Sequence, residues 1–314
     1  MMRALLFPIV IFGICAGTAG AQNFPNRVIR MITTEAGGAS DIASRFMTQA
    51  LANNLGQPAI VENRGIIGVE IVQQAVPDGH VLLHYTSPLW IIPLFRRNTP
   101  WEPLRDFAPI ALTVNSPNLL AVHPSLPVTT VAQLVALAKA RPGELNYASS
   151  SSGSGNHLAA ELFKSMTGAK IERIAFKGAG AAINAVIGGQ IHVMFPTAGS
   201  VTQHIKQGRL RALAVTSFEP SAIVPGLPTM AEAGVHGYES QSRTALFAPA
   251  KTPPAVIARI HAEVARALNQ PEVKERLFAA GLEVIASTPQ EATAVIKTEM
   301  ARMGRLIDEA GLRE

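Results

Sequence analysis

The chain has 314 residues, of which 16% are charged and 48% are hydrophobic, and its formal net charge is +5. The basic residues are scattered along the chain rather than gathered into runs, which argues against a nucleic-acid-binding protein, because such a protein needs a concentrated basic stripe. About 290 residues follow the first 21, more than one hydrophobic core usually organises, so we expect two lobes.

The first residues have the layout of a secretory signal peptide. Arg3 supplies a positive charge, an apolar run extends from Ala4 to Ala16, and small residues follow up to Ala21. We predict cleavage after Ala21, so that residues 1–21 are removed. An uncleaved anchor is the alternative, but the apolar run is well short of the roughly 20 residues that span a bilayer. Cys15, the one cysteine, follows the bulky Ile14, so we expect no lipid attachment and no thiol in the mature chain.

From Arg27 onward, short apolar runs alternate with stretches of helical periodicity, which predicts an α/β fold of parallel sheets covered by helices. The strands expected in a first lobe are Val28 to Thr33, Ala59 to Glu62, Val81 to Tyr85 and Ala108 to Val114, and the helices are Asp41 to Leu55 and Val69 to Ala75. Between them the segment Tyr85 to Trp101 is aromatic and interrupted by prolines. We interpret it as a cover for the first sheet, with a place beside a ligand as the alternative.

Leu119 to His123 is expected to cross into a second lobe of the same plan. Its predicted elements are the helices Val131 to Ala140, His157 to Gly168, Ala181 to Gly188 and Val201 to Gln207, and the strands Asn146 to Ala148, Ile171 to Phe176, Ile191 to Phe195 and Ala212 to Thr216. The strand Ser242 to Ala248 then returns, and the helices Pro253 to Leu268, Pro271 to Ala280 and Pro289 to Glu309 pack on the first lobe.

This order predicts a discontinuous first lobe, residues 22–122 with 241–314, and a second lobe, residues 123–240. Two strands that cross between lobes form a hinge, and ligands bind between such lobes at the carboxyl ends of the strands.

The turn from Thr33 to Asp41 lies between a strand and a helix. Its backbone N–H groups and the helix dipole favour an anion such as a carboxylate, with Gly37, Gly38, Ser40 and Asp41 as the candidate contacts. The alternative is an ordinary tight turn with Ser40 or Asp41 as the helix N-cap. Glu35 would repel an anion unless its side chain points away.

A second turn of this kind runs from Ser149 to His157. Ser149, Gly153 and Ser154 offer hydroxyls and backbone donors, and one anion-binding turn in each lobe suits a ligand with two polar ends. The alternative is a flexible serine-rich loop. We expect His157, in the first turn of the next helix, to pack or cap rather than to bind a metal.

Two further turns lie at the same predicted edge. Lys177 stands in the turn Phe176 to Gly180, where a surface role is the alternative, and Thr197 stands in the turn Phe195 to Ser200. The sequence has no G-x-G-x-x-G fingerprint, P-loop, nucleophile elbow or metal-binding histidine spacing. We therefore predict no cofactor, no metal site and no catalytic residue.

A set of short motifs extends over essentially the whole mature chain. They are Phe24-Pro25, Val28-Ile29-Arg30, Gly37 to Asp41, Gly56-Gln57-Pro58, Val61 to Arg64, Pro77-Asp78-Gly79, Asn146-Tyr147, Gly153-Ser154, His157 to Ala159, Glu161 to Phe163, Phe176 to Gly178, Gly188 to Gln190, Leu227 to Thr229 and Glu232 to Gly234. In content and order they resemble the periplasmic substrate-binding components of tripartite tricarboxylate transporters, often called Bug-type receptors.

The resemblance implies a type II periplasmic-binding-protein fold, with two Rossmann-like lobes joined by crossing hinge strands. It implies a periplasmic receptor that closes on a small mono-, di- or tricarboxylate, or on a related acid, and hands it to membrane transporter subunits without inserting into the membrane itself. In this family the ligand is held through backbone groups, hydroxyls and ordered water. The matching positions here are Gly37, Gly38, Ser40 and Asp41 in one lobe and Ser149, Gly153, Ser154 and His157 in the other. A monomer is expected.

The chain departs from the family pattern in three places. It has Glu35-Ala36 where a proline usually precedes the paired glycines, a shortened Gly65-Ile66-Ile67-Gly68 stretch, and Pro196 where an aspartate is common. Each lies near the predicted ligand site, so either a loss or a change of the usual carboxylate specificity stays open. Two other functions stay open: a sensory receptor for a membrane signalling partner, and an enzyme on the same fold. The titratable candidates for an enzyme, Glu35, Asp41, His157 and Lys177, show no paired geometry in the sequence.

Overall fold

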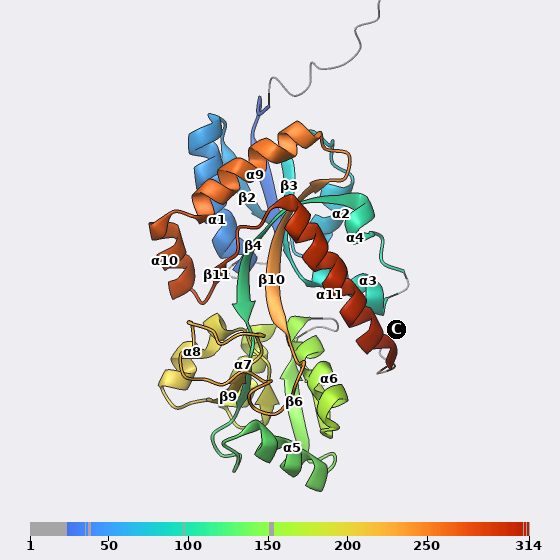
Figure 1. Cartoon of the computed structure of the whole chain (residues 1–314), viewed down its shortest axis with the longest axis vertical. Helices are drawn as coiled ribbons and strands as arrows, with labels where there is room; N and C mark the ends of the chain where they lie inside the picture. The colour runs from blue at the N-terminus through green and yellow to red at the C-terminus, as the bar shows by residue number, and fades with distance from the viewer. Residues whose placement is uncertain are drawn as a thin grey trace, which may run out of the picture.

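The computed structural model describes residues 24–34, 36, 39–96, 98–150, 154–309, 311 and 313. It places them in two lobes, each built on its own β-sheet (Figure 1). The predicted signal peptide, residues 1–21 with Cys15, lies outside the described residues. Among the helices that are described, none combines the length and the apolar character needed to cross a bilayer.

The first lobe is built on a six-stranded sheet in the order β11-β4-β10-β3-β1-β2. β1 (Ile29–Thr33) runs parallel to β2 (Ala59–Asn63) and β3 (Val81–Thr86), whereas β10 (Gln241–Pro249) runs antiparallel to β3 and to β4 (Phe107–Pro117), and β11 (Glu283–Val284) antiparallel to β4. α1 (Ala39–Leu55), α9 (Pro254–Leu268) and α10 (Pro271–Ala279) contribute to one apolar core of this lobe. α2 (Ile67–Gln73), α3 (Pro88–Phe95) and α11 (Pro289–Glu309) contribute to another, and α4 (Pro103–Asp106) precedes β4.

The second lobe is built on a five-stranded sheet in the order β7-β6-β8-β5-β9. Its strands are β5 (Leu119–Val122), β6 (Leu145–Ser149), β7 (Ile171–Ala175), β8 (Val193–Met194) and β9 (Arg211–Val215). α5 (Val131–Ala140) and α6 (Gly155–Thr167) share one core, and α7 (Ala179–Ile187) and α8 (Ala198–Lys206) share the other.

The chain passes between the sheets on β4 and β10. β4 ends at Pro117 and β5 begins at Leu119, while Gln241, the first residue of β10, pairs with Pro117. β1, β2 and β3 in one sheet and β6, β7 and β8 in the other are parallel, as expected. The sheets are mixed because every antiparallel pair involves β4, β5 or β10, the strands on which the chain passes between the lobes. β5 already pairs in the second sheet, although it precedes the predicted boundary at 122/123. The lobe boundaries themselves stay a prediction.

The proline-interrupted segment after β3 forms α3. Pro88 occupies a first-turn position, where no N–H is needed, and the helix tolerates Pro93 over its short length. Trp90 is fully buried against Phe247, and Trp101 donates its indole N–H to the carbonyl of Leu89 at 2.8 Å. The segment thus covers the first sheet, as predicted, and it also reaches the second lobe.

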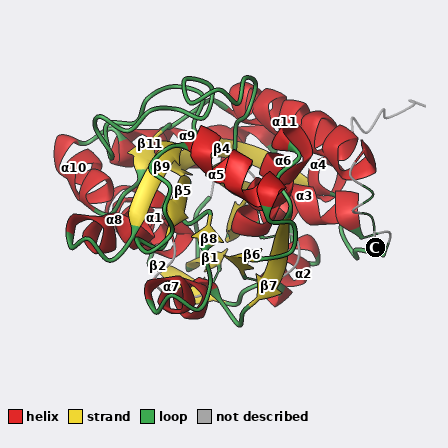
Figure 2. Cartoon of the chain, turned by 90° about the horizontal axis from the view of Figure 1, so that it is seen from below, coloured by secondary structure: helices red, strands yellow, loops and turns green. Residues whose placement is uncertain are grey.

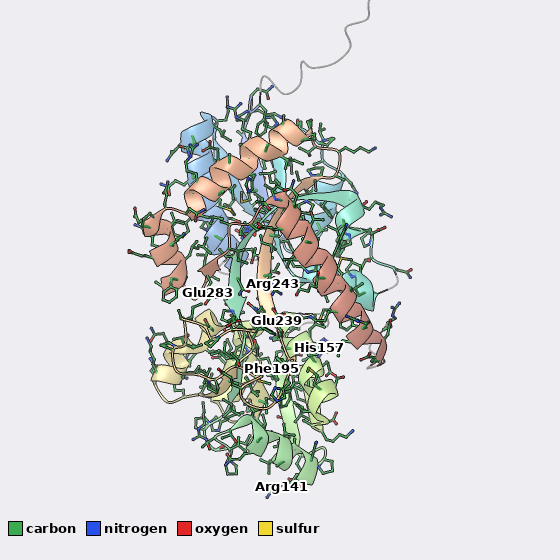
Figure 3. The ribbon with its side chains drawn as sticks, in the orientation of Figure 1. Arg141, His157, Phe195, Glu239, Arg243 and Glu283 are labelled. Atoms are coloured by element: carbon green, nitrogen blue, oxygen red, sulfur yellow. The ribbon has the colours of Figure 1, made fainter. Side chains whose placement is uncertain are left out.

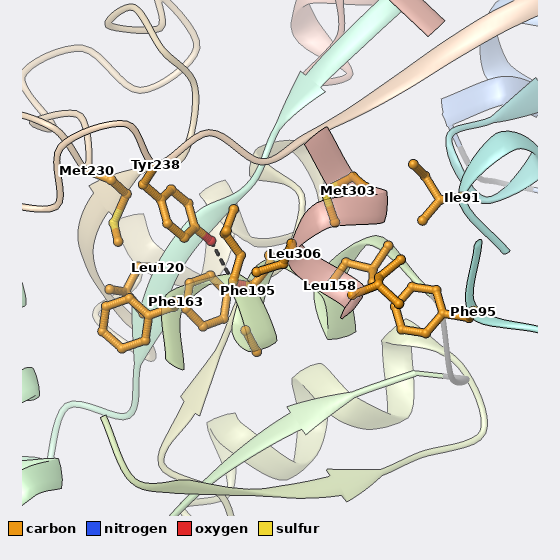
Figure 4. Close-up of a cluster of buried hydrophobic side chains, with 14 of the residues drawn as sticks. Ile91, Phe95, Leu120, Leu158, Phe163, Phe195, Met230, Tyr238, Met303 and Leu306 are labelled. Carbon is orange, nitrogen blue, oxygen red and sulfur yellow. Dashed lines mark hydrogen bonds between the residues drawn. The ribbon is translucent and has the colours of Figure 1, made fainter. Parts of the chain in front are cut away.

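An apolar contact joins the lobes on this side. Ile91 and Phe95 of α3, Leu158 of α6, and Met303 and Leu306 of α11 are all buried, and they belong to one continuous core (Figure 4). Seen from below, α11 and α9 lie along one side of the molecule, while β1, β2, α7 and β7 lie along the other (Figure 2). The apolar contact therefore lies on the side of α11, opposite the side of β1 and β7.

Candidate functional site

The turn before α1 is held by a buried carboxylate. Asp41 is almost fully buried, and its carboxylate accepts from Arg45 at 3.0 Å and from the amide of Asn63 at 3.0 Å. The same amide group donates to the carbonyl of Thr34 at 2.8 Å, and the hydroxyls of Thr34 and Ser40 form a hydrogen bond. The side chains of Ser40 and Asp41 are thus committed to the shape of the turn. Gly37, Gly38 and Glu35 lie outside the described residues.

His84, at the carboxyl end of β3, supports this turn from inside the lobe. Its ring is fully buried, with Nδ1 2.9 Å from the carbonyl oxygen of Ser40 and 2.7 Å from the hydroxyl of Ser44. Nε2 lies 2.8 Å from the hydroxyl of Thr113 on β4, and Thr113 lies 3.1 Å from the carbonyl oxygen of Thr244 on β10. The ring therefore connects the turn to both strands that cross between the lobes.

The charge state of His84 follows from its burial. Burial lowers the pKa of the imidazole to about 3, so the ring is neutral near neutral pH. Because a carbonyl oxygen can only accept, we assign the proton to Nδ1, which donates to Ser40. The one hydroxyl hydrogen of Thr113 then goes either to Nε2 or to the carbonyl oxygen of Thr244. A neutral, fully buried ring is a structural support rather than a proton donor to a ligand.

The turn before α6 is held by a different set of groups. Asn156 accepts through its side-chain oxygen from the hydroxyl of Ser154 at 2.6 Å, and from the hydroxyl and the backbone N–H of Ser150 at 3.1 and 3.3 Å. Arg173, on β7, donates to the hydroxyl of Ser149 at 2.8 Å and to the carbonyl of Ser150 at 3.1 Å. A guanidinium thus lies at this turn, while Gly153 falls outside the described residues.

His157 contacts the other lobe. It is buried at the start of α6, and its ring lies 6.2 Å from the ring of Phe95 on α3. Figure 3 shows it at the upper end of the second lobe, close to where the lobes meet. The packing role expected for this residue agrees with its position, and any contact with a ligand stays a proposal.

Lys177 and Thr197 follow the neighbouring strands of the second sheet. Lys177 is exposed in the turn between β7 and α7. Thr197 is half-buried just before α8, and its hydroxyl lies 3.1 Å from that of Ser200. Pro196, which replaces the common aspartate, donates no hydrogen bond, but its carbonyl accepts from the N–H of Leu119 at 2.8 Å. This turn is therefore tied to the start of β5, where the chain enters the second lobe.

The turns of the second lobe share one edge of its sheet, and the chain after β3 of the first lobe reaches that edge. Ser149 pairs with Ala175 and Ala148 pairs with Met194, so the turns after β6, β7 and β8 share one edge of the second sheet. Ser87 and Pro88, which follow β3 in the first lobe, line the same small cavity of about 20 Å³ as Gly155 at the start of α6. That cavity has room for about one water molecule. The carboxyl end of β3 therefore lies near the start of α6.

A charged cluster lies where β10 begins. Glu239 accepts from Arg243 at 2.5 Å and from Arg302 of α11 at 2.9 Å, and Figure 3 shows Glu239 and Arg243 at the junction of the lobes. Although burial alone would raise the pKa of Glu239, the two guanidinium groups hold it below its usual value. Burial raises the pKa of Glu299, which accepts from the indole of Trp90 at 3.2 Å. These groups fix the returning chain to α11.

A second contact joins the lobes beside β11. A Cβ atom added to Gly199 of α8 would lie 2.4 Å from the carbonyl oxygen of Ala280, so the backbones approach too closely for any side chain. The hydroxyl of Ser221 donates to Glu283 at 2.7 Å. Substitutions at Gly199 would push the lobes apart.

The described part of the chain contains no group of three or more His, Cys, Asp or Glu side chains arranged to hold a metal ion. The sequence pattern missed two residues that support the turns, His84 and Arg173. His84 is a polar residue inside an apolar strand, and Arg173 is a cation on a strand that ends beside a turn. Each of these residues is out of place in its strand and could have indicated a structural role. The residue that it contacts could not be identified, because that residue follows a different strand.

Comparisons with known proteins agree on one relationship. A family model described as the tripartite tricarboxylate transporter family receptor matches residues 43–312. BugT of Bordetella pertussis is 34% identical over 322 residues, covering 99% of this chain and 99% of BugT. An R. palustris protein solved with adipate is 32% identical, with a TM-score of 0.84, over 92% of this chain and 98% of that one. MatC from Rhodopseudomonas palustris, solved with malate, is 28% identical, with a TM-score of 0.79, over 90% of this chain and 100% of MatC.

Proposed function

The chain belongs to the tripartite tricarboxylate transporter receptor family of periplasmic solute-binding proteins, and from this premise we propose that it captures a small carboxylate between its lobes. It then delivers the acid to the membrane subunits of a tripartite transporter. The protein acts in the periplasm as a monomer, without catalysing a reaction on its ligand.

The observation that carries this proposal is the pair of strand-to-helix turns, one in each lobe, that precede α1 and α6. Each turn precedes a helix of more than ten residues, α1 with 17 and α6 with 13, so each helix dipole favours an anion at its start. The ligands named for two related structures, adipate and malate, each carry two carboxylates. Two turns in opposite lobes suit an acid with two polar ends.

The proposed ligand contacts are the ten residues predicted from the sequence. They are Gly37, Gly38, Ser40, Asp41, Ser149, Gly153, Ser154, His157, Lys177 and Thr197. Because the side chains of Ser40 and Asp41 are engaged within their turn, we assign them backbone contacts. The hydroxyls of Ser149, Ser154 and Thr197 donate to the ligand in place of their present acceptors, Ser150, Asn156 and Ser200. Lys177 supplies a charge at the rim.

Binding is tested by thermal shift and calorimetry of the purified chain with adipate, malate, benzoate and neutral amides of these acids. A ligand that binds only the folded state raises the melting temperature. We expect a clear shift with at least one acid, and a loss of about tenfold in affinity in Ser154→Ala, the equivalent of one hydrogen bond. Ser125→Ala is the matched control, because that hydroxyl bonds His123 on an exposed loop.

If the folded wild-type chain shows no shift with any acid, the carboxylate assignment is wrong. Delivery is tested separately by deleting the gene and measuring uptake of the acid that binds. Unchanged uptake would contradict the transport role and favour a sensory one.

A further inference from the structure

The backbones of the two lobes touch beside β11. Gly199 is the second residue of α8 in the second lobe, and Gly281 lies in the turn between α10 and β11 of the first lobe. A Cβ atom added to either glycine would overlap backbone atoms of the other lobe. Because the two backbones are already in contact, the lobes cannot come closer at this point.

The close approach explains why residue 199 is a glycine. Glycine is less favourable than alanine inside a helix, because it loses more backbone freedom on folding. Gly281 has a positive φ of 77°, which itself favours glycine, but Gly199 is helical and has no such need. The carbonyl oxygen of Ala280 occupies the space that a side chain at position 199 would take. The arrangement of the lobes in this structure therefore requires glycine at position 199.

Both sides of the glycine contact are tied to the chain that crosses between the lobes. In the first lobe, the hydroxyl of Ser116, near the end of β4, donates to the carbonyl of Gly281 at 3.1 Å. In the second lobe, Asn118, between β4 and β5, forms an antiparallel bridge with Thr197, two residues before Gly199. The contact therefore lies beside the hinge. When lobes turn about a hinge, a small change in spacing near it becomes a larger separation farther away.

Other contacts on both flanks of the crossing strands agree with this arrangement. Figure 1 shows α8, α10 and β11 on one flank of β4 and β10, and α3, α6 and α11 on the other. On the first flank Ser221 donates to Glu283 of β11. On the second flank Leu158 of α6 belongs to the same apolar core as Ile91 of α3 and Met303 of α11. The glycine contact is thus one of several that hold the lobes at one spacing.

Building on the proposed function, we propose that Gly199 is a positioning residue: its contact with Gly281 sets the spacing of the lobes around a bound acid, and thereby the length of the acid that fits. Thr197, two residues before Gly199, is one of the proposed ligand contacts, so the glycine contact fixes how far this residue lies from the first lobe. A methyl group at position 199 holds the lobes apart. A longer acid then spans the wider gap better than the acid that the wild type prefers.

The experiment compares acids that differ by one methylene group. Calorimetry with succinate and glutarate, adipate and pimelate, malate and hydroxyglutarate, and benzoate and phenylacetate gives the affinities of the wild type, Gly199→Ala and Gly180→Ala. Gly180 is the matched control, because it is likewise the second residue of a helix of the second lobe, α7, and a Cβ atom there would meet nothing within 4 Å. X-ray scattering of each protein, with and without acid, measures the separation of the lobes.

We expect Gly199→Ala to bind the acid that the wild type prefers about tenfold more weakly, and to bind its longer homologue at least as well as the wild type does. With acid bound, Gly199→Ala should scatter as a more extended molecule than the wild type, whose scattering should match the arrangement described above. Gly180→Ala should keep the wild-type affinities. An unchanged preference between homologues in Gly199→Ala, or an equal loss for both members of every pair, would overturn the inference.

The two proposals fail in different ways. If the folded wild-type chain binds none of these acids, the proposed function falls, and the role of Gly199 falls with it. If the wild type and a folded Gly199→Ala bind an acid and its homologue with the same preference, the receptor function stands and the role of Gly199 is wrong. Melting temperatures without ligand show that each variant is folded. Should Gly199→Ala fail to fold, the wild type decides, because liganded lobes at another separation would overturn the inference by themselves.

Discussion

The turn before α1 and the turn before α6 occupy matching places in the two lobes, but different chemistry holds them. The first is supported by the neutral, fully buried ring of His84 and by an acid, Asp41, whose charge is engaged within the turn. The second is bridged by the half-buried cation Arg173. We infer that the first turn is part of the rigid interior of its lobe, whereas the second is held from the edge strand of its sheet.

The largest expected effect is a loss of folding stability when His84 is replaced. His84→Leu leaves the carbonyl of Ser40 and the hydroxyl of Ser44 buried without the ring, so we expect a loss of about 3 kcal/mol in the free energy of unfolding. Urea denaturation measures it. His236→Leu, at an exposed loop position, should change stability by less than about 0.5 kcal/mol. If the two variants are equally stable, the first turn does not depend on the ring.

The His84 ring also predicts that the free energy of unfolding depends on pH. Its pKa is lowered from 6.5 to about 3 on folding, so below pH 6.5 the unfolded chain binds a proton that the folded chain does not. Stability is therefore full above pH 6.5 and falls as the pH drops toward 3, by about 2 kcal/mol between pH 7 and pH 5. Urea titrations of wild type and His84→Gln at these two pH values measure this contribution. Equal losses in both proteins would contradict it.

The smallest expected effect concerns Asp41. Asp41→Asn removes a carboxylate and releases Arg45, whose side chain is 60% exposed. Because the guanidinium of Arg45 already offsets the charge of Asp41, we expect the affinity for an acid to rise only about two- to fivefold. Calorimetry with the acid and its amide at low and high salt measures it. A fall in the acid-to-amide ratio would show that the first lobe, too, favours the anion.

Much of the fold could be predicted from the sequence because its helices carry local signals. α5 was expected at Val131 to Ala140 and is found there, since Thr130 and Gln133 form a capping box before an apolar stripe. α11 likewise begins at Pro289 and ends at Glu309, as predicted. α3 was missed because Pro88 and Pro93 looked like interruptions, although one of them starts the helix.

The two residues that hold the turns from neighbouring strands, His84 and Arg173, could not be predicted in the same way. Periodicity placed Asp41 and Ser149 beside strand ends, but His84 contacts a residue 44 positions earlier, and Arg173 contacts one 24 positions earlier. Such pairs depend on which strands become neighbours. The order β3-β1-β2 brings His84 to the turn after β1, and the order β7-β6 brings Arg173 to the turn after β6.

The position of β10 sets the order in which the chain can fold. In the first sheet β10 lies between β3 and β4, so no backbone hydrogen bonds join β1, β2 and β3 to β4 and β11, and the sheet becomes continuous only when β10 is inserted. The strands of the second sheet, from Leu119 to Val215, all precede β10 in the chain and can pair without it. We therefore expect the inserted lobe to form early and the first lobe to remain two open half-sheets, with exposed strand edges, until the C-terminal quarter arrives.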